Sequence, residues 1–153
     1  MDEGLYYGGL AEGRRNGLGL AVFSNGEYYY GHFKEDLFHG EGFYFWNNRQ
    51  YFLGIFDTGK KTEGQWYGKH KYIGQVKGNK RHGIGWCLYA TGKAYEGEWF
   101  EGKYHGSGIM TEPSGERFIG LFKKGTKWGR GYYLAEHCRI TGVWDGEQAN
   151  GPV

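Results

Sequence analysis

Apolar and polar residues alternate along most of the chain, and glycines interrupt the alternation at regular intervals. A period of two is typical of β-strands, and no stretch shows the 3.6-residue period of an amphipathic helix. A pentad of the form aromatic-x-Gly-x-apolar returns with spacings of 23, 23, 20, 23, 23 and 22 residues. Its central glycines, which define position 0 of each repeat, are Gly8, Gly31, Gly54, Gly74, Gly97, Gly120 and Gly142.

Each repeat has the pattern of a β-hairpin. The pentad is the first strand, a turn follows near position +5, and most repeats carry a Gly-x-Gly at positions +9 and +11 that begins the second strand. Six to seven such hairpins predict an all-β fold of about 12 to 14 strands. We expect an elongated single-layer antiparallel meander of repeated hairpins, forming a single domain over residues 1–153 with no helices of note.

The parity of the strands predicts the core. Positions −2, 0 and +2 share one face, so an aromatic ring and an apolar side chain flank a bare glycine. Rings from adjoining strands can lie across this uncovered backbone, which explains glycine inside a strand. We therefore expect positions −2 and +2, such as Tyr95 and Trp99, to be the most buried, with side chains at Gly97 or Gly106 excluded by a ring.

The third repeat departs from this pattern. It has Glu63 and Gln65 where the Gly-x-Gly is expected, and it is three residues short. The sequence therefore predicts a bulge or a bend in the middle of the sheet.

Composition argues against collagen and against disorder as the source of the many glycines. The 153 residues include 31 Gly but only 2 Pro, without a Gly-X-Y period, which excludes collagen. Aromatic residues make up 20% of the chain, and disordered chains are poor in them. Cys87 and Cys138 lack metal-site spacing and are expected to be free thiols in a reducing compartment. The N-terminal residues resemble no secretory signal, so we expect a cytoplasmic protein.

The repeat resembles the MORN family (membrane occupation and recognition nexus), whose unit is Tyr-x-Gly-x-Trp/Phe, a Gly, and His-Gly-x-Gly. Residues 95–108, YEGEWFEGKYHGSG, match this unit almost position for position. The resemblance implies a β-sheet interaction platform without catalysis, often in cytoskeletal, ciliary or membrane-junction assemblies. The truncated seventh repeat is its weakest part.

The face opposite the glycines is the candidate protein-binding surface. An antiparallel sheet with one solvated face should be polar there, yet positions −1, +12 and +14 are largely apolar. The candidate contact residues are Tyr30, Phe43, Phe45, Ile73, Trp86 and Leu88. Burial of this row by strong curvature is the alternative. We expect a non-catalytic scaffold, a structural subunit of a larger assembly, whose partner is another protein or a second copy of the chain.

Positive charge gathers in the middle of the chain, where residues 59–93 hold eight basic and one acidic side chain. The alternative function is a peripheral membrane adaptor that binds anionic phospholipids such as phosphoinositides, because each basic residue near such a surface contributes about 1 kcal/mol. The candidate anion-binding residues are Lys60, Lys61, Lys80 and Arg81. Solvated loop lysines would give the same pattern. Nucleic acid is disfavoured because the aromatic residues are committed to the core.

The sequence gives little support for catalytic or metal-binding residues. His39, His82 and His105 share one repeat position, which places them about two strands, or 9 to 10 Å, apart in adjacent hairpins. That spacing is too wide for one metal ion, so we expect turn-supporting histidines. His137 and Cys138 point to opposite faces of a strand and make a poor nucleophile and base. We expect no cofactor and no catalytic residue, with an accessory segment of an enzyme as a distant third function.

Overall fold

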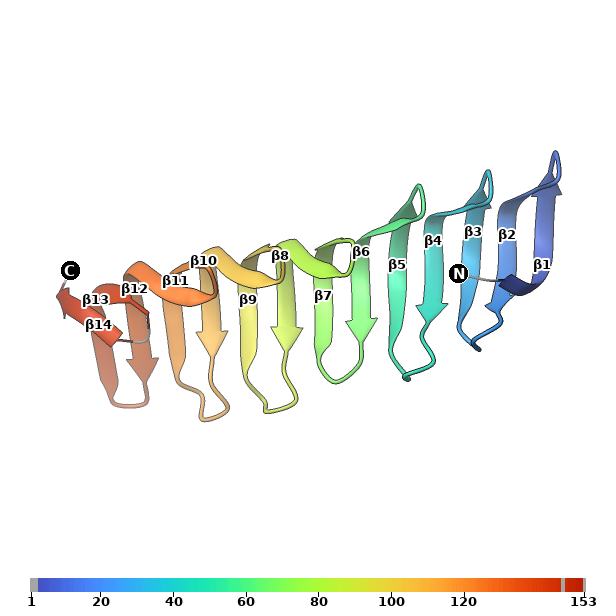
Figure 1. The fold of residues 1–153 in the computed structure, drawn as a ribbon. Helices are drawn as coiled ribbons and strands as arrows, with labels where there is room; N and C mark the ends of the chain where they lie inside the picture. Colours follow the sequence, from blue (N-terminus) through green and yellow to red (C-terminus); the bar gives the residue numbers. More distant parts are fainter. Residues whose placement is uncertain (1–2, 147, 153) are drawn as a thin grey trace. The chain divides into compact units, whose positions relative to one another are not determined.

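The chain is all-β in the computed structural model, which describes residues 3–146 and 148–152. Within each of the two units described below, Figure 1 shows strand after strand in sequence order, joined by short turns. The described residues form no helix. They therefore include no helix long and apolar enough to span a membrane. The chain divides into two compact units. The first comprises residues 1–69 and 76–79, and the second comprises residues 70–75 and 80–153.

The first unit holds three hairpins in an antiparallel sheet, in which each strand pairs with the next. Its strands are β1 (Glu3–Ala11), β2 (Arg14–Phe23), β3 (Tyr28–Lys34), β4 (Leu37–Phe45), β5 (Tyr51–Asp57) and β6 (Lys60–Tyr67). Opposite the pentad glycine of each hairpin lies a glycine of the partner strand, as in the pair Gly31 and Gly42. β7 (Lys71–Lys77) is divided between the two units.

The second unit continues the same pattern. Its strands are β8 (Lys80–Leu88), β9 (Ala94–Phe100), β10 (Lys103–Thr111), β11 (Arg117–Lys123), β12 (Thr126–Ala135), β13 (Cys138–Asp145) and β14 (Gln148–Pro152). The predicted antiparallel meander of hairpins is therefore confirmed within each unit. A single domain over residues 1–153 stays a prediction.

The core of each unit is a layer of rings from positions −2 and +2. Tyr95 and Trp99 are buried, with their rings edge to face at 4.9 Å and 81°. Trp99 also stands edge-on to Tyr72 at 5.6 Å. Tyr29 and Phe33 repeat this contact in the first unit at 5.1 Å and 82°. The predicted core is confirmed in the second to sixth repeats, whereas Leu10 in the edge strand β1 is 66% exposed and Ile140, at position −2 of the seventh repeat, is 44% exposed.

The glycine at position +11 makes room for the ring at position −2. A Cβ atom on Gly108 would overlap the Tyr95 ring. The Tyr95 hydroxyl then donates a hydrogen bond of 2.7 Å to the Glu98 carbonyl, and Tyr29 and Tyr72 make the equivalent bonds to position +1. The Tyr95 ring thus crosses the neighbouring strand at Gly108, which has no side chain.

The glycine at position +9 has a different role from the one predicted. Gly106 has φ of 56°, a left-handed conformation, and a Cβ there would meet the Glu98 carboxylate, not a ring. It belongs to a bulge, since His105 pairs with Glu98 and Gly108 with Gly97, which leaves two extra residues on β10. The prediction that a ring excludes a side chain at Gly106 was therefore wrong.

The third repeat carries the predicted bulge in a smaller form. Bulges with two extra residues occur in the first, second, fifth and sixth hairpins. In the third, Ile55 pairs with Glu63 and Phe56 with Lys61, which leaves only Thr62 extra. Gly64 then lies opposite Gly54. The predicted bulge of this repeat is therefore present, but it is smaller than those of the other four hairpins.

Truncating Trp99 tests the core. Trp99→Ala removes a buried ring and the hydrogen bond of 3.0 Å from its indole nitrogen to the Gly85 carbonyl. The free energy of unfolding should fall by about 3 to 5 kcal/mol in urea denaturation. The adjacent Phe100 is 52% exposed, so the control Phe100→Ala should cost less than about 1 kcal/mol. Equal costs for the two variants would contradict this core.

Adding a methyl group at Gly108 tests the ring crossing. Gly108→Ala should cost about 1 to 3 kcal/mol, because the new Cβ competes with the Tyr95 ring for the same space. The cost should shrink in a Tyr95→Leu background, which lacks the ring. A double-mutant cycle by chemical denaturation measures this coupling. The same cost in both backgrounds would refute the crossing.

Candidate interaction surfaces

The face opposite the core in the first unit carries exposed apolar side chains. Tyr30 is 51% exposed and Leu53 is 48% exposed, both at position −1. Phe43 and Phe45 are half-buried. The structure thus places the three first-unit candidates, Tyr30, Phe43 and Phe45, on one solvent-facing surface, although the two phenylalanines are more enclosed than Tyr30.

An aromatic ladder encloses the two phenylalanines. Phe45 stacks on Tyr28 at 5.2 Å, and Phe43 stacks on Tyr51 at 5.3 Å. Tyr51 in turn stacks on Tyr67 at 4.7 Å. The first and last of these contacts join directly opposed residues of neighbouring strands, and the contact between Phe43 and Tyr51 is diagonal. Sequence reasoning missed the ladder, although the tyrosines at position −3, Tyr28 and Tyr51, were a signal for it.

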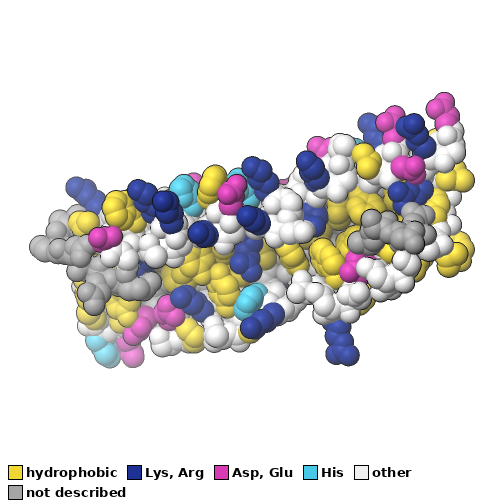
Figure 2. Space-filling model, viewed as in Figure 1, with side chains coloured by type: hydrophobic (Ala, Val, Ile, Leu, Met, Phe, Trp, Pro, Cys, Tyr) yellow, Lys and Arg dark blue, Asp and Glu magenta, His cyan; other side chains and the backbone are white. Residues whose placement is uncertain are grey.

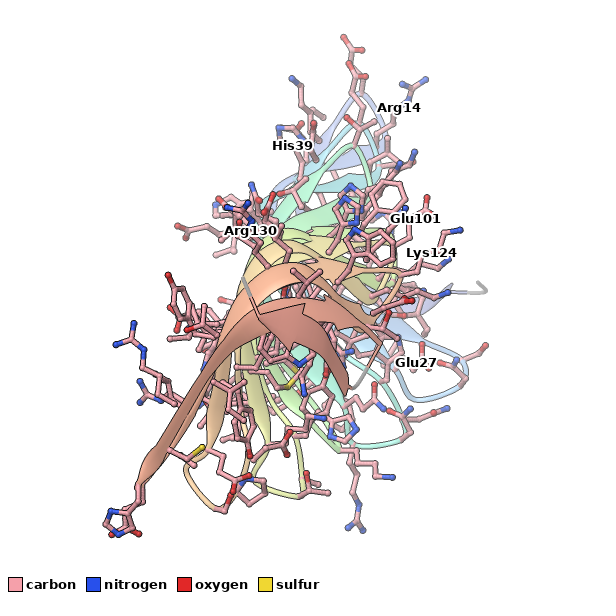
Figure 3. All side chains as sticks on the ribbon, turned by 90° about the vertical axis from the view of Figure 1, so that its left-hand side faces the viewer. Arg14, Glu27, His39, Glu101, Lys124 and Arg130 are labelled. Atoms are coloured by element: carbon pink, nitrogen blue, oxygen red, sulfur yellow. The ribbon has the colours of Figure 1, made fainter. Side chains whose placement is uncertain are left out.

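The corresponding face of the second unit is less aromatic. Ile73 is 38% exposed, Leu88 is 37% exposed and Trp86 is half-buried. Further along this face lies a groove of about 580 Å³, whose apolar walls include Ile109, Ile119 and Tyr132. Two opposite charges, Glu96 and Arg130, also line it. Figure 3 shows Arg130 on the opposite side of the ribbon from Glu101 and Lys124.

Lys61, one of the four predicted anion-binding residues, does not extend freely into solvent. Its ammonium lies 5.2 Å from the Trp46 ring centroid and 5.7 Å from that of Trp66, and these two rings stack on each other. The amine also donates a hydrogen bond of 2.6 Å to the Asn79 side chain. Burial lowers the pKa of the Lys61 ammonium. The alternative of a solvated loop lysine therefore does not describe Lys61.

Arg81 occupies the same repeat position, +7, and is also packed on rings. Its guanidinium carbon lies 5.2 Å from the Trp99 ring centroid and 5.8 Å from that of Tyr72. Arg15, again at +7, lies 4.9 Å from the Phe33 ring and forms an ion pair of 3.0 Å with Asp36. In the first, third and fourth repeats position +7 therefore lays a cationic group on aromatic rings, which hold cations by their π faces, whereas Phe38 and Tyr104 occupy this position in the second and fifth.

Lys60 and Lys80 differ from these two residues. Both are exposed at the start of a second hairpin strand, Lys60 in the first unit and Lys80 in the second. The predicted anion-binding set therefore divides into two exposed lysines and two cations packed against aromatic rings.

Two of the three candidate histidines, His39 and His82, support turns as expected. The His82 Nδ1 atom accepts a hydrogen bond of 3.1 Å from the Glu101 backbone N–H, and His39 Nδ1 accepts a longer one of 3.5 Å from that of Thr58. Each bond joins neighbouring hairpins. Across the described part of the chain, histidine, cysteine and acidic side chains form no group that could hold a metal ion. Cys87 is buried and Cys138 exposed, and both thiols are free.

The comparisons with known proteins identify the repeat. A profile of the MORN repeat matches residues 6–28, 29–51, 72–94 and 95–117, more than half of the chain. The chain therefore belongs to the MORN-repeat family. The matched segments leave out residues 52–71, which contain the shortened third repeat. MORN repeats are non-catalytic modules that generally mediate interactions with proteins or membranes.

Part of the chain is also similar to a protein of Plasmodium falciparum (isolate 3D7) named inactive protein tyrosine kinase pTKL. The two are 34% identical over 65 residues, which is 42% of this chain and 4% of that protein. The chain thus spans a small fraction of this relative.

Removing the Lys61 charge tests its burial. Because the folded-state pKa lies below the ordinary 10.5, folding disfavours the charged amine at neutral pH. Lys61→Met should therefore match or exceed the wild-type free energy of unfolding near pH 7. As pH rises from the folded-state pKa towards 10.5, the free energy of unfolding of the wild type should increase relative to that of the variant. In this range the unfolded state binds the Lys61 proton more than the folded state does.

Urea titrations of both proteins across this pH range measure the difference. A wild-type advantage that instead shrinks with rising pH would show that the folded state favours the charged amine.

Proposed function

We propose that this MORN-repeat chain is a non-catalytic scaffold that binds a protein partner through the face opposite its ring core. The observation that carries the proposal is the exposed aromatic surface of the first unit, where Tyr30 and Leu53 adjoin the ladder of Tyr28, Phe43, Phe45, Tyr51 and Tyr67. Contiguous exposed apolar surface marks interaction sites, and aromatic rings dominate the energetics of interfaces.

The ladder suits this surface to binding. Stacked rings are held in place by their neighbours, so little side-chain entropy is lost when a partner covers them. Tyrosine contributes a large apolar area and a hydroxyl that tolerates water, which suits a surface exposed before association. Ile73, Trp86 and Leu88 supply a smaller apolar contact in the second unit.

We further propose that the chain is a structural subunit of a larger cytoplasmic assembly of the cytoskeletal or ciliary kind. The free thiols of Cys87 and Cys138 are compatible with a reducing compartment, because paired cysteines are typical of oxidising ones. The competing function is the peripheral membrane adaptor, for which the exposed Lys60 and Lys80 remain available.

A charge placed on the aromatic surface tests the scaffold. Tyr30→Glu and Leu53→Glu, at positions half exposed before binding, should abolish native co-purification of the protein partner or of a second copy. Ser114→Glu, in an exposed turn of the second unit, adds the same charge and should leave association intact. Urea denaturation should show that all three variants keep wild-type stability within about 1 kcal/mol.

Salt separates the two functions. Association through the apolar face should persist at about 0.3 M salt, whereas sedimentation with acidic vesicles should be lost there because screening weakens surface charge attraction. Partner capture unaffected by both glutamate variants would refute the proposed surface. Vesicle binding that is lost in Lys60→Ser/Lys80→Ser and in salt, without partner capture, would favour the membrane adaptor.

A further inference from the structure

A basic cavity lies at the hairpin turns of the second unit. It has a volume of about 550 Å³ and is lined by Lys80, Lys103, Lys123 and Lys124, together with Phe100, Glu101, Tyr104 and His105. We call it the lysine basin. Figure 2 shows Lys and Arg side chains along the upper edge of this unit. Figure 3 shows Glu101 and Lys124 projecting to the same side of the ribbon.

The turns that carry these lysines are held together by backbone hydrogen bonds. The Gly125 N–H, in the β11–β12 turn, donates to the Tyr104 carbonyl at 3.1 Å. The Gly102 N–H, in the β9–β10 turn, donates to the Arg81 carbonyl at 2.8 Å. Residues Glu101 and Lys124 adopt positive φ of 47° and 52° in these turns. The basin is therefore built on connected turns and requires no rearrangement to form.

The charge of the basin is unbalanced. Four lysines line it, and Glu101 is the one acidic residue of the lining. The ion pairs that the structure describes lie elsewhere, as between Lys93 and Glu112 at 3.6 Å, and none involves the four basin lysines. Lys123 makes a cation–π contact of 4.8 Å with the Trp128 ring, which leaves its charge uncompensated. Like charges gathered in a concave site attract a counter-anion.

Aromatic rings form one wall of the basin. Phe100 is 52% exposed there, and the rings of His82 and His105 contact it at 5.2 and 5.5 Å. The Tyr104 hydroxyl is already used, since it donates to the Tyr89 hydroxyl at 2.7 Å. A cavity of this size accommodates a small organic ligand, and its rings can support the carbon skeleton of such a ligand.

We propose that the lysine basin binds a compact ligand that carries several phosphate groups. Lysine ammonium groups are compact point charges that bind phosphate oxygens approaching from several directions. Four such groups belong to the residues that line the basin. The ligand is a soluble polyphosphorylated compound or a phosphorylated lipid headgroup. This site is separate from the proposed protein-binding face and does not depend on it.

Inositol hexakisphosphate is the soluble probe, with binding followed by titration calorimetry on the full chain. Lys103→Gln/Lys123→Gln should weaken binding about twentyfold, because each surface charge contact is equivalent to about a fivefold change. Lys34→Gln/Lys60→Gln alters the same two repeat positions, +3 and +6, in the first unit and changes the net charge equally. This control should change affinity less than about threefold, since its charges lie outside the basin.

The basin carboxylate provides a test in the opposite direction. Glu101→Gln should raise affinity about threefold to fivefold, because it removes the one negative charge of the lining. Glu35→Gln, at the same turn position in the first unit, should leave affinity unchanged. A gain of affinity on removing a residue cannot come from unfolding.

Vesicles of phosphatidylcholine with and without phosphatidylinositol bisphosphate distinguish the two ligand sources. If the chain sediments with the phosphorylated vesicles and inositol hexakisphosphate reverses this sedimentation, the ligand is a lipid headgroup. If the chain binds the soluble probe but does not sediment with the vesicles, the ligand is a soluble compound. Undetectable binding of the soluble probe would overturn the proposal, as would equal losses in the two double-lysine variants.

Discussion

The crossing of a ring over a bare glycine on the next strand determines the rest of this structure. At Tyr95 the ring occupies the space that a Cβ on Gly108 would fill, and its hydroxyl reaches the Glu98 carbonyl. Glycine inside a strand is unfavourable by itself, and burial of an aromatic ring offsets that cost. The contact recurs in the first six hairpins, so the ring layer needs no second sheet or helix to cover it.

The glycine period was sufficient to predict the hairpins and the buried face, because a strand's parity decides which residues share a side. It was not sufficient to predict the bulge. Gly106 is required for its left-handed φ, a backbone property that its spacing does not distinguish from the ring-crossing role of Gly108. The shortened third repeat lacks a +9 glycine and still forms a bulge, with one extra residue instead of two. Its Gly64 still meets Gly54, because the bulge absorbs the missing residue.

The candidate surfaces were predictable only in part. The exposure of Tyr30 follows from its position −1. The stacking of Tyr51 on Tyr67 depends on register within a hairpin whose bulge differs from the others. Lys61 belonged to a charged run in sequence, yet its long stem lets the amine reach Trp46 and Trp66, which charge counting cannot show. Contacts between separate turns are likewise invisible to a repeat pattern.

The repeat assigns different constraints to its positions. A change at position 0, −2 or +11 disturbs the ring crossing, whereas positions −3, −1 and +6 point away from it and can vary without disturbing the layer. The two units use this freedom differently. Tyrosine occupies position −3 in the first unit at Tyr28 and Tyr51, where it builds an aromatic surface. Lysine occupies position +6 in the second unit at Lys80 and Lys103, where it contributes to a basic cavity. One scaffold interaction thus supports two chemically distinct surfaces, because the residues that make the surfaces are not those that hold the sheet.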